Sequence, residues 1–287
     1  MEVSVALAIF SSSSQELEEN FYGNSKKLGR TRLEDWGKSV GAIVQGLIIP
    51  NVFGPFGKPF YNSFIATFCH LIANGQVPEI HVDKTVSLIY VQELVEKMIE
   101  LIGQENSGEK VEVQATSEMK VSEVLEKLRH YSEVYQLNGN IPSLTNSFEI
   151  NLFNTFRSFI DLSTFFPKKL TPHADSRGAF VEIVRLGIGG QVSFSTTFPG
   201  ITRGNHFHTR KIERFAVIKG KALIKLRRIG TNELHDFYLD GDKPAYVDMP
   251  IWYTHNIKNI GEDTLYTIFW INEPFDTNDP DTYFEIV

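Results

Sequence analysis

The sequence contains one cysteine, Cys69, among its 287 residues, so the chain cannot form an internal disulfide. This cysteine usage fits a reducing compartment, and we expect a cytoplasmic protein. No apolar run approaches the roughly 20 residues that a membrane-spanning helix needs. The net charge is −7 and no long basic run occurs, so neither nucleic acid nor an anionic membrane is an expected partner.

The first residues, MEVSVALAIFSSSS, do not have the form of a signal peptide. Glu2 stands where a positive start is expected, and the apolar part is short. We therefore interpret residues 3–10 as a buried strand that ends in four serines. These serines are the only low-complexity tract, and no internal repeat is found.

The periodicity of apolar residues changes near Pro167. Before it, apolar strands alternate with amphipathic helices, which is typical of an α/β domain. After it, short strands recur at regular spacing with turn residues between them, as in an all-β barrel. We predict an α/β domain over residues 1–167 and an all-β barrel over residues 168–287. The strands expected in the barrel include 180–186, 191–198, 213–218, 222–229, 234–239, 245–249, 255–259 and 264–271.

The stretch GITRGNHFHTRKIERFAVIKG, residues 200–220, has the spacing of a metal site. His206 and His208 are two apart, so both point to one side of a strand. Glu213 breaks this parity, so we predict a turn near residues 209–211 and a second strand that brings the carboxylate inward. His255 completes a set of three histidines and one carboxylate, which suits zinc or another divalent metal. The alternative is that these histidines are ordinary core or surface residues.

Tyr22 and Lys26 are four residues apart and would share one face of a helix. There the ammonium group could lower the pKa of the phenol toward a value useful for proton donation. The spacing alone is a weak signal, and a solvated helix face is the alternative. A serine-tipped strand just before these residues and the turn PNVFGP after them strengthen the functional interpretation.

Two motifs in the C-terminal part resemble those of the cupin β-barrels. The first joins Gly200, His206, His208, Glu213 and Gly220 at the family's spacing. The second runs from Pro250 through His255 to Asn259, with Trp252 where the family usually has glycine. This departure bears on the local turn and leaves the ligands intact.

The N-terminal part looks like the second half of an extended short-chain dehydrogenase/reductase, a Rossmann-like fold that acts on nucleotide sugars. The resemblance implies a catalytic set of Ser13, with Ser12 as the near alternative, Tyr22 and Lys26. Tyr22 and Lys26 would also bind the cofactor. Asn51, in the PNVFG turn, would contact the nucleotide sugar.

The segments DSRGAFVE (175–182) and RGNH (203–206) are similar to signatures of the cupin-type epimerases of 4-keto-6-deoxy nucleotide sugars. Those enzymes are metal-free and usually have glutamine where this chain has His208, so His208 favours a metal site over a bare base. Arg177 and Arg203 suit the diphosphate of a substrate, because guanidinium pairs with phosphate oxygens through two hydrogen bonds. Surface arginines after turns are the alternative.

Together, the two parts resemble the bifunctional UDP-sugar epimerase-reductases of capsule and O-antigen synthesis, which make UDP-2-acetamido-2,6-dideoxy-L-talose on the way to L-fucosamine. The resemblance implies that the cupin inverts carbon 3 of a UDP-4-keto-6-deoxy-N-acetylhexosamine with Zn²⁺. The other domain would reduce the ketone at carbon 4 with NADPH. It also implies a homodimer. The base at carbon 3 is open, with Tyr253 a candidate only because it adjoins the second motif.

No glycine-rich turn follows a strand in this sequence, although the resemblance leads us to expect one for the cofactor's pyrophosphate. We therefore expect that roughly 80 to 100 residues, the first βαβ units, are missing. A longer protein, a misplaced gene start or a separate chain that supplies the dinucleotide-binding half would account for this. In each case, this chain alone should bind NADPH poorly.

Two other functions remain open from the sequence. The chain could be a non-enzymatic module that binds a sugar nucleotide or a metal. It could also be a metal oxygenase of the broad cupin class, although the Arg-Gly-x-His signature at 203–206 argues against this.

Overall fold

The computed structural model describes residues 7–102, 110–170, 172–175, 178–181, 183, 189–273 and 276–287. By its internal contacts the chain divides into two compact units. The first unit comprises residues 1–71 and 77–127, and the second comprises residues 72–76 and 128–287. The boundary predicted at Pro167 stays a prediction about sequence domains, since compactness alone groups residues 128–167 with the C-terminal strands.

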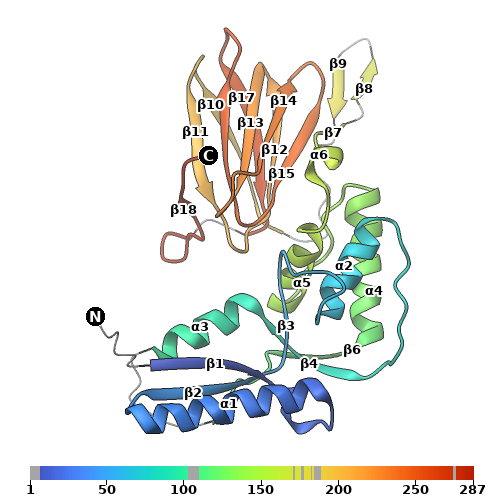
Figure 1. Ribbon diagram of the computed structural model, residues 1–287. Coiled ribbons are helices and arrows are strands. Elements are labelled where there is room, and N and C mark those ends of the chain that lie inside the picture. The colour runs from blue at the N-terminus through green and yellow to red at the C-terminus, as the bar shows by residue number, and fades with distance from the viewer. Residues whose placement is uncertain are drawn as a thin grey trace. The chain divides into compact units, whose positions relative to one another are not determined.

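A parallel three-stranded sheet organises the first unit (Figure 1). The central strand, with the sequence IVQGLII, is buried at every position after the first, as expected of a parallel strand covered on both faces. The sheet consists, in spatial order, of β1 (Leu7–Ser13), β2 (Ile43–Ile49) and β5 (Lys110–Glu112).

Helix α1 (Phe21–Val40) connects β1 to β2. It begins after Asn20, whose side chain accepts a hydrogen bond from the amide of Gly23. It ends at Gly41, whose φ of 70° is the left-handed conformation that glycine adopts without steric cost. These two residues fix the position of Tyr22 and Lys26 in the first two turns of the helix.

A second small sheet completes the first unit. Its strands, in order, are β3 (Asn51–Phe53), β4 (Thr85–Tyr90) and β6 (Ser117–Lys120). Leu47, Ile49, Ile89 and Leu94 form a core cluster that joins the two sheets to helix α3. The remaining elements are η1 (Ser14–Leu17), α2 (Phe64–Ala73), α3 (Val91–Leu101) and α4 (Val121–Tyr131), of which α2 and α4 extend into the second unit.

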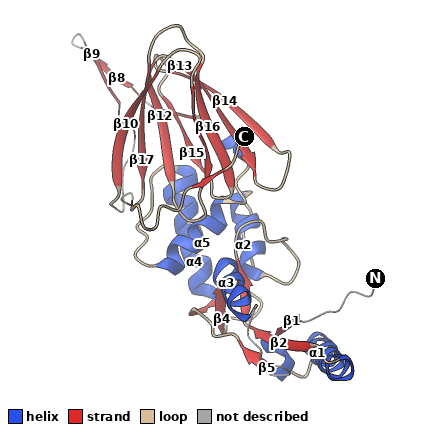
Figure 2. Cartoon of the chain, turned by 90° about the vertical axis from the view of Figure 1, so that its left-hand side faces the viewer, coloured by secondary structure: helices blue, strands red, loops and turns tan. Residues whose placement is uncertain are grey.

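Two five-stranded antiparallel sheets form most of the second unit (Figure 2). The first sheet has the order β10-β17-β12-β15-β7, with β10 (Gln191–Thr197), β17 (Leu265–Ile271), β12 (Glu213–Lys219), β15 (Ala245–Met249) and β7 (Lys168–Lys169). The second has the order β14-β13-β16-β11-β18, with β14 (Leu234–Asp240), β13 (Lys221–Arg228), β16 (Tyr253–Asn259), β11 (Thr202–Phe207) and β18 (Tyr283–Phe284).

The two sheets pack face to face, since the ring centroids of Phe215 on β12 and His255 on β16 lie 5.9 Å apart. Along β13 and β14, buried residues that face the other sheet alternate with more exposed residues that face outward, as the sequence pattern predicts. We call this part the two-sheet domain. The other elements of the unit are η2 (Ser132–Leu137), α5 (Ser147–Arg157), α6 (Leu162–Phe165) and a hairpin of β8 (Pro172–Asp175) and β9 (Gly178–Val181).

Most predicted elements are confirmed, with three corrections. The first strand is β1 at residues 7–13, later than the predicted 3–10, whose first four residues lie outside the described part of the chain. The predicted strand 180–186 corresponds to β9, which ends at Val181, and residues 182 and 184–186 of the prediction lie outside the described residues. The strand predicted to carry both His206 and His208 is β11, but it ends at Phe207, so His208 lies just after it.

Candidate functional sites

Four predicted metal ligands meet in the two-sheet domain. His206 on β11 faces His255 on β16 as a direct cross-strand pair. His208 follows the end of β11, and Glu213 is the first residue of β12. Each of the four offers one ligand atom, and these atoms all lie within 4.8 Å of one another. The turn predicted near residues 209–211 is confirmed, because β11 ends at Phe207 and β12 begins at Glu213.

A bulge in β11 brings His206 opposite His255. The register shifts between Gly204 and His206, where Gly204 has a φ of 101° and Asn205 a φ of 62°. A Cβ on residue 204 would lie 2.8 Å from the carbonyl oxygen of His255. The glycine of the RGNH segment is therefore needed for the close approach of the two strands.

Three of the four candidate ligand atoms are buried and lack hydrogen-bond partners. The Nε2 atoms of His208 and His255 lie 3.1 and 3.2 Å from Oε2 of Glu213, but none of these three atoms has a partner in hydrogen-bonding geometry. Buried polar atoms without partners are costly. A divalent cation between them would satisfy all of them, so the donor set fits zinc, which prefers histidine and carboxylate ligands.

The protonation states of these residues differ. Burial, and next the neighbouring His255, lower the pKa of His206 to about 4, so this imidazole is neutral at pH 7. Burial also opposes charge on Glu213, but His208 and His255 outweigh it and hold the pKa of the carboxyl below its usual value. Burial lowers the pKa of His208, but Glu213 more than compensates, so the net pKa is raised. Without metal, Glu213 therefore favours the protonated form of His208.

Trp252 adopts the glycine-like conformation that its position in the second motif requires. Its φ is 61°, and its amide donates a hydrogen bond of 2.8 Å to the carbonyl oxygen of His208. Its ring stacks on Phe207 with 5.6 Å between ring centroids, and Phe207 in turn stacks on Tyr283. The departure from the motif thus affects the turn while the ligand His255 keeps its place.

The predicted reductase residues share one pocket of about 410 Å³ in the first unit. Ser13, Tyr22, Lys26 and Asn51 all line it. A pocket of this size suits a small ligand or part of a larger one. It lies where β1 and β2 end, which is where parallel α/β sheets bind their ligands.

Contacts within this pocket distinguish the two candidate serines. The hydroxyl of Ser12 donates a hydrogen bond to the buried carboxylate of Glu16, which also pairs with Arg30. Ser13 instead accepts a hydrogen bond of 3.2 Å from the amide of Gln15, so its hydroxyl proton is available to a ligand. The serine that the resemblance favours is therefore the one with a free donor.

Lys26 lies between the serine strand and Tyr22. Its Nζ donates a hydrogen bond of 3.0 Å to the carbonyl oxygen of Ser11 and lies 5.7 Å from the centre of the Tyr22 ring. The prediction that Tyr22 and Lys26 share one face of a helix is thus confirmed. Asn51 is exposed at the start of β3, and its side-chain amide donates to the carbonyl oxygen of Ser87.

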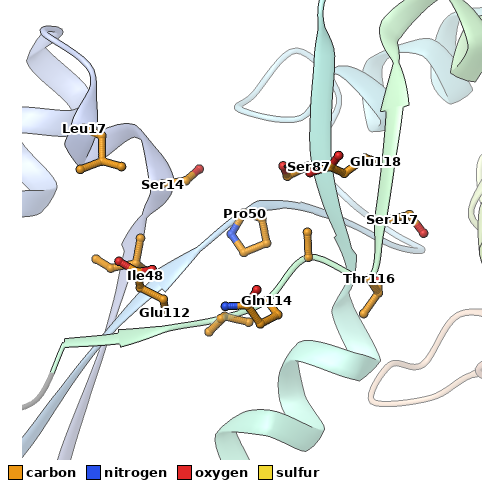
Figure 3. Close-up of a pocket in the computed structure, with 12 residues that line it drawn as sticks. Ser14, Leu17, Ile48, Pro50, Ser87, Glu112, Gln114, Thr116, Ser117 and Glu118 are labelled. Atoms are coloured by element: carbon orange, nitrogen blue, oxygen red, sulfur yellow. Dashed lines mark hydrogen bonds between the residues drawn. The ribbon is translucent and has the colours of Figure 1, made fainter.

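A second pocket of about 480 Å³ is drawn in Figure 3. It adjoins the first, since Pro50 lines both. In Figure 3, Ser87 and Glu118 lie side by side on β4 and β6, and their side chains are 3.3 Å apart. The lining is rich in hydroxyl, amide and carboxylate groups. Sequence reasoning missed this pocket, because its residues come from five separate elements and from two connections between elements.

Two other predicted residues, Arg203 and Tyr253, are not part of these clusters. Arg177 lies outside the described residues, and Arg203 is exposed on β11. Tyr253 is buried on β16, and its hydroxyl donates a hydrogen bond of 3.2 Å to Glu233. Burial, followed by the charge of Glu233, raises the pKa of Tyr253, which disfavours it as a base in this state.

Comparison with known proteins follows the two parts of the chain. Residues 11–114 match the NAD dependent epimerase/dehydratase family, and residues 173–283 match the polysaccharide biosynthesis C-terminal domain. The chain is 34% identical over 282 residues to the UDP-2-acetamido-2,6-beta-L-arabino-hexul-4-ose reductase of Pseudomonas aeruginosa, covering 96% of this chain and 74% of that protein. The chain belongs to the family of this reductase. Another relative is the spore coat polysaccharide biosynthesis protein SpsL of Bacillus subtilis, 28% identical over 124 residues, which are 40% of this chain and 82% of SpsL.

Solved structures agree with membership in this reductase family. The capsular polysaccharide assembling protein CapF from Staphylococcus aureus is 37% identical, with a TM-score of 0.57, over 98% of this chain and 78% of that one. A crystal structure of CapF with the inhibitor 3-isopropenyl-tropolone gives 36% identity and a TM-score of 0.52, over 97% of this chain and 78% of that chain. These comparisons lend no support to the expectation that the first βαβ units are missing, which stays a prediction.

None of the helices in the described residues has both the length and the apolar character to cross a bilayer.

Proposed function

We propose that this protein modifies a nucleotide sugar in capsular polysaccharide synthesis, with one active site in each unit. Its relatives carry the names of a UDP-sugar reductase and of a capsular polysaccharide assembling protein, which supports the substrate class and the pathway. The observation on which the proposal rests is the convergence of His206, His208, Glu213 and His255, remote in sequence, to within 4.8 Å. We assign epimerisation at carbon 3 to this cluster.

The four residues would hold a divalent cation, for which zinc is our first choice. When bound, such an ion polarises a ketone oxygen and so acidifies the proton on the neighbouring carbon. The protein's own contribution is to keep His206 neutral by burial and to present buried ligand atoms without competing hydrogen bonds. Arg203 and Arg177 would bind the diphosphate of the UDP-4-keto sugar.

We assign reduction of the carbon 4 ketone to the pocket in the first unit. NADPH would supply the hydride to carbon 4, and the phenol of Tyr22 would give its proton to the oxygen, leaving an alcohol and NADP⁺. Ser13 would donate a hydrogen bond to the same oxygen before the transfer. Lys26, held by the carbonyl oxygen of Ser11, would stabilise the phenolate and contact the cofactor ribose. Asn51 would bind the nucleotide sugar from the edge of this pocket.

The test of epimerisation is exchange of the carbon 3 proton of a UDP-4-keto-6-deoxy-N-acetylhexosamine in deuterated water, followed by NMR without NADPH. We expect exchange with zinc-loaded protein, none after chelation, and none with His255→Ala. Tyr22→Phe serves as the matched control, because it should leave exchange intact while removing reduction of the ketone. Zinc bound without exchange would overturn the epimerase assignment, and tight UDP-sugar binding at background turnover would favour a non-enzymatic binding module.

Four further expectations stay predictions: the homodimer, the cytoplasmic location, the weak binding of NADPH by this chain alone and the separate partner chain.

A further inference from the structure

The C-terminal segment 276–287 lies against the candidate metal centre. Its short strand β18 pairs with the end of β11, where Phe284 is opposite His206 and Tyr283 is opposite Phe207. The segment is also held by β13, because Arg227 of this strand forms an ion pair with Glu285 at 2.7 Å. We call residues 276–287 the C-terminal strap. It brings one buried acidic residue, Asp281, to the loop that joins two of the ligands.

The main-chain carbonyl of Asp281 selects one tautomer of His208. The Nδ1 atom of the His208 ring is within hydrogen-bonding distance of this carbonyl oxygen, 73 residues away in sequence. A carbonyl oxygen can only accept, so Nδ1 must carry the proton. The lone pair of a neutral His208 ring is then on Nε2, the atom that faces Glu213. A metal ligand held in this way is fixed in both tautomer and ring orientation.

The carboxylate of Asp281 binds the loop between the ligands. Oδ1 accepts hydrogen bonds from the amide of Thr209 at 3.0 Å and from its hydroxyl at 2.6 Å. Oδ2 accepts from the amides of Arg210 at 3.0 Å and of Lys211 at 2.9 Å. Three successive loop amides therefore converge on one side chain that is only 2% exposed. His208 precedes this loop and Glu213 follows it.

The backbone of Asp281 adopts an unusual conformation that allows both sets of contacts. Its φ is 37°, in the left-handed region that non-glycine residues rarely adopt. In this conformation its carbonyl and its carboxylate both face the loop. The strap is bound in return by the loop, since Nζ of Lys211 donates a hydrogen bond of 2.7 Å to the carbonyl oxygen of Pro280.

We propose that Asp281 is the positioning residue of the metal centre: it sets the tautomer of His208 and fixes the loop that spaces His208 from Glu213. This inference rests on the proposed metal centre and adds the C-terminal strap to it. Asp281 contacts no reacting atom, so its effect is on metal affinity through its two neighbours. Loss of comparable outer contacts typically weakens metal binding roughly 10- to 100-fold.

The experiment measures zinc affinity by competition with a chelating dye in the full chain. Asp281→Ala removes all four carboxylate hydrogen bonds and should weaken zinc binding roughly 10- to 100-fold. Asp281→Asn keeps one acceptor oxygen and should give a smaller loss. Asp279→Asn is the matched control in the same strap, because Asp279 pairs with Arg210 at the surface, is 67% exposed at its side chain and should not alter the affinity.

Nitrogen NMR of the imidazole rings in metal-free protein separates positioning from mere stability. Asp281→Ala keeps the main-chain carbonyl at residue 281 but removes the carboxylate contacts that hold it against the loop. We therefore expect His208 to carry its proton on Nδ1 in the unaltered chain and to become a mixture of tautomers in this variant, at a pH above its titration. Unfolding curves check that each variant is folded, and Asp281→Asn provides the test if Asp281→Ala is not. Unaltered zinc affinity and an unaltered tautomer in a folded variant would overturn the inference alone. No zinc binding by the unaltered chain would overturn the metal centre and the inference with it.

Discussion

Arg214 on β12 and Asp248 on β15 form a buried ion pair across adjacent strands. Nε and Nη2 of the guanidinium lie 2.8 and 3.0 Å from the two carboxylate oxygens, and both side chains are at most 2% exposed. The hydroxyl of Tyr135, on η2, donates a further hydrogen bond of 2.7 Å to Asp248. Arg214 also donates to the carbonyl oxygen of Gly139. The pair thus joins the segment after α4 to the sheet that holds Glu213.

Removal of one member of this pair should be strongly destabilising. Asp248→Asn leaves the charge of Arg214 buried without compensation, and we expect a loss of about 3–5 kcal/mol in the free energy of unfolding. Asp236→Asn is the matched control, because its partner Lys225 lies at the surface and such pairs contribute about 0–1 kcal/mol. Denaturant unfolding followed by tryptophan fluorescence measures both. Equal losses in the two variants would contradict a special role for the buried pair.

Gly204 should not tolerate a side chain. Gly204→Ala places a Cβ 2.8 Å from the carbonyl oxygen of His255 and 3.0 Å from Cα of Asn256, at a φ of 101°. The backbone strain alone costs about 1–3 kcal/mol, and the contact should also push β11 away from β16. We therefore expect lower stability and weaker zinc binding.

Gly230→Ala is the control, since its φ of 73° is also positive but no atom lies within 4 Å. It should lose about 1–2 kcal/mol and bind zinc normally, so a similar loss of zinc binding in both variants would disprove the close-approach argument.

Trp252 offers a direct test of backbone strain against ring stacking. Trp252→Gly loses the stack on Phe207 but relieves the φ of 61°, whereas Trp252→Ala loses the stack and keeps the strained conformation. We expect the alanine variant to be less stable than the glycine variant by about 1 kcal/mol, as measured by thermal or denaturant unfolding. If the alanine variant is the more stable of the two, the left-handed conformation is not what the turn requires.

The sequence was sufficient to predict the metal-ligand cluster, because strand geometry and short motifs determine the spacing of His206, His208 and Glu213. The turn between β11 and β12 followed from the same parity argument. Tyr22 and Lys26 were predictable for a similar reason, since a helix places residues four apart on one face. In each case the contacts follow from local structure that a short segment specifies.

Asp281 and the buried ion pair could not be predicted in this way. Asp281 reaches His208 from 73 residues away, and nothing in its neighbourhood distinguishes it from the other acidic residues near the C-terminus. Arg214 and Asp248 occupy outward positions of their strands, where alternation predicts solvated charges. They are buried because the segment around Tyr135 covers them, which is a tertiary effect.

His206 should make the metal-free protein sensitive to mild acid. Its pKa is lowered from 6.5 to about 4 by burial and by the nearby His255, so the folded state stays unprotonated where the unfolded state takes up a proton. Between pH 6.5 and pH 4.5 the unfolded state therefore binds more protons, and stability falls as the pH falls. His208 does not oppose this trend. Its pKa is raised in the folded state, so its contribution to the free energy of unfolding is fully present below pH 6.5 and stays constant across this window. Glu213 titrates below this window, since its pKa is lowered from 4.5.

The measurement is denaturant unfolding at both ends of this window, with a chelator present to keep the protein metal-free. His206→Asn should reduce the loss of stability on acidification by at most about 1.4 kcal/mol per pH unit, the value for one proton. His130→Asn, an exposed histidine on α4, should leave the pH dependence unchanged. If His206→Asn follows the pH dependence of the unaltered chain, then His206 must take up its proton as readily in the folded state as in the unfolded one. The neutral imidazole that the metal centre requires at pH 7 would then depend on the metal itself rather than on burial.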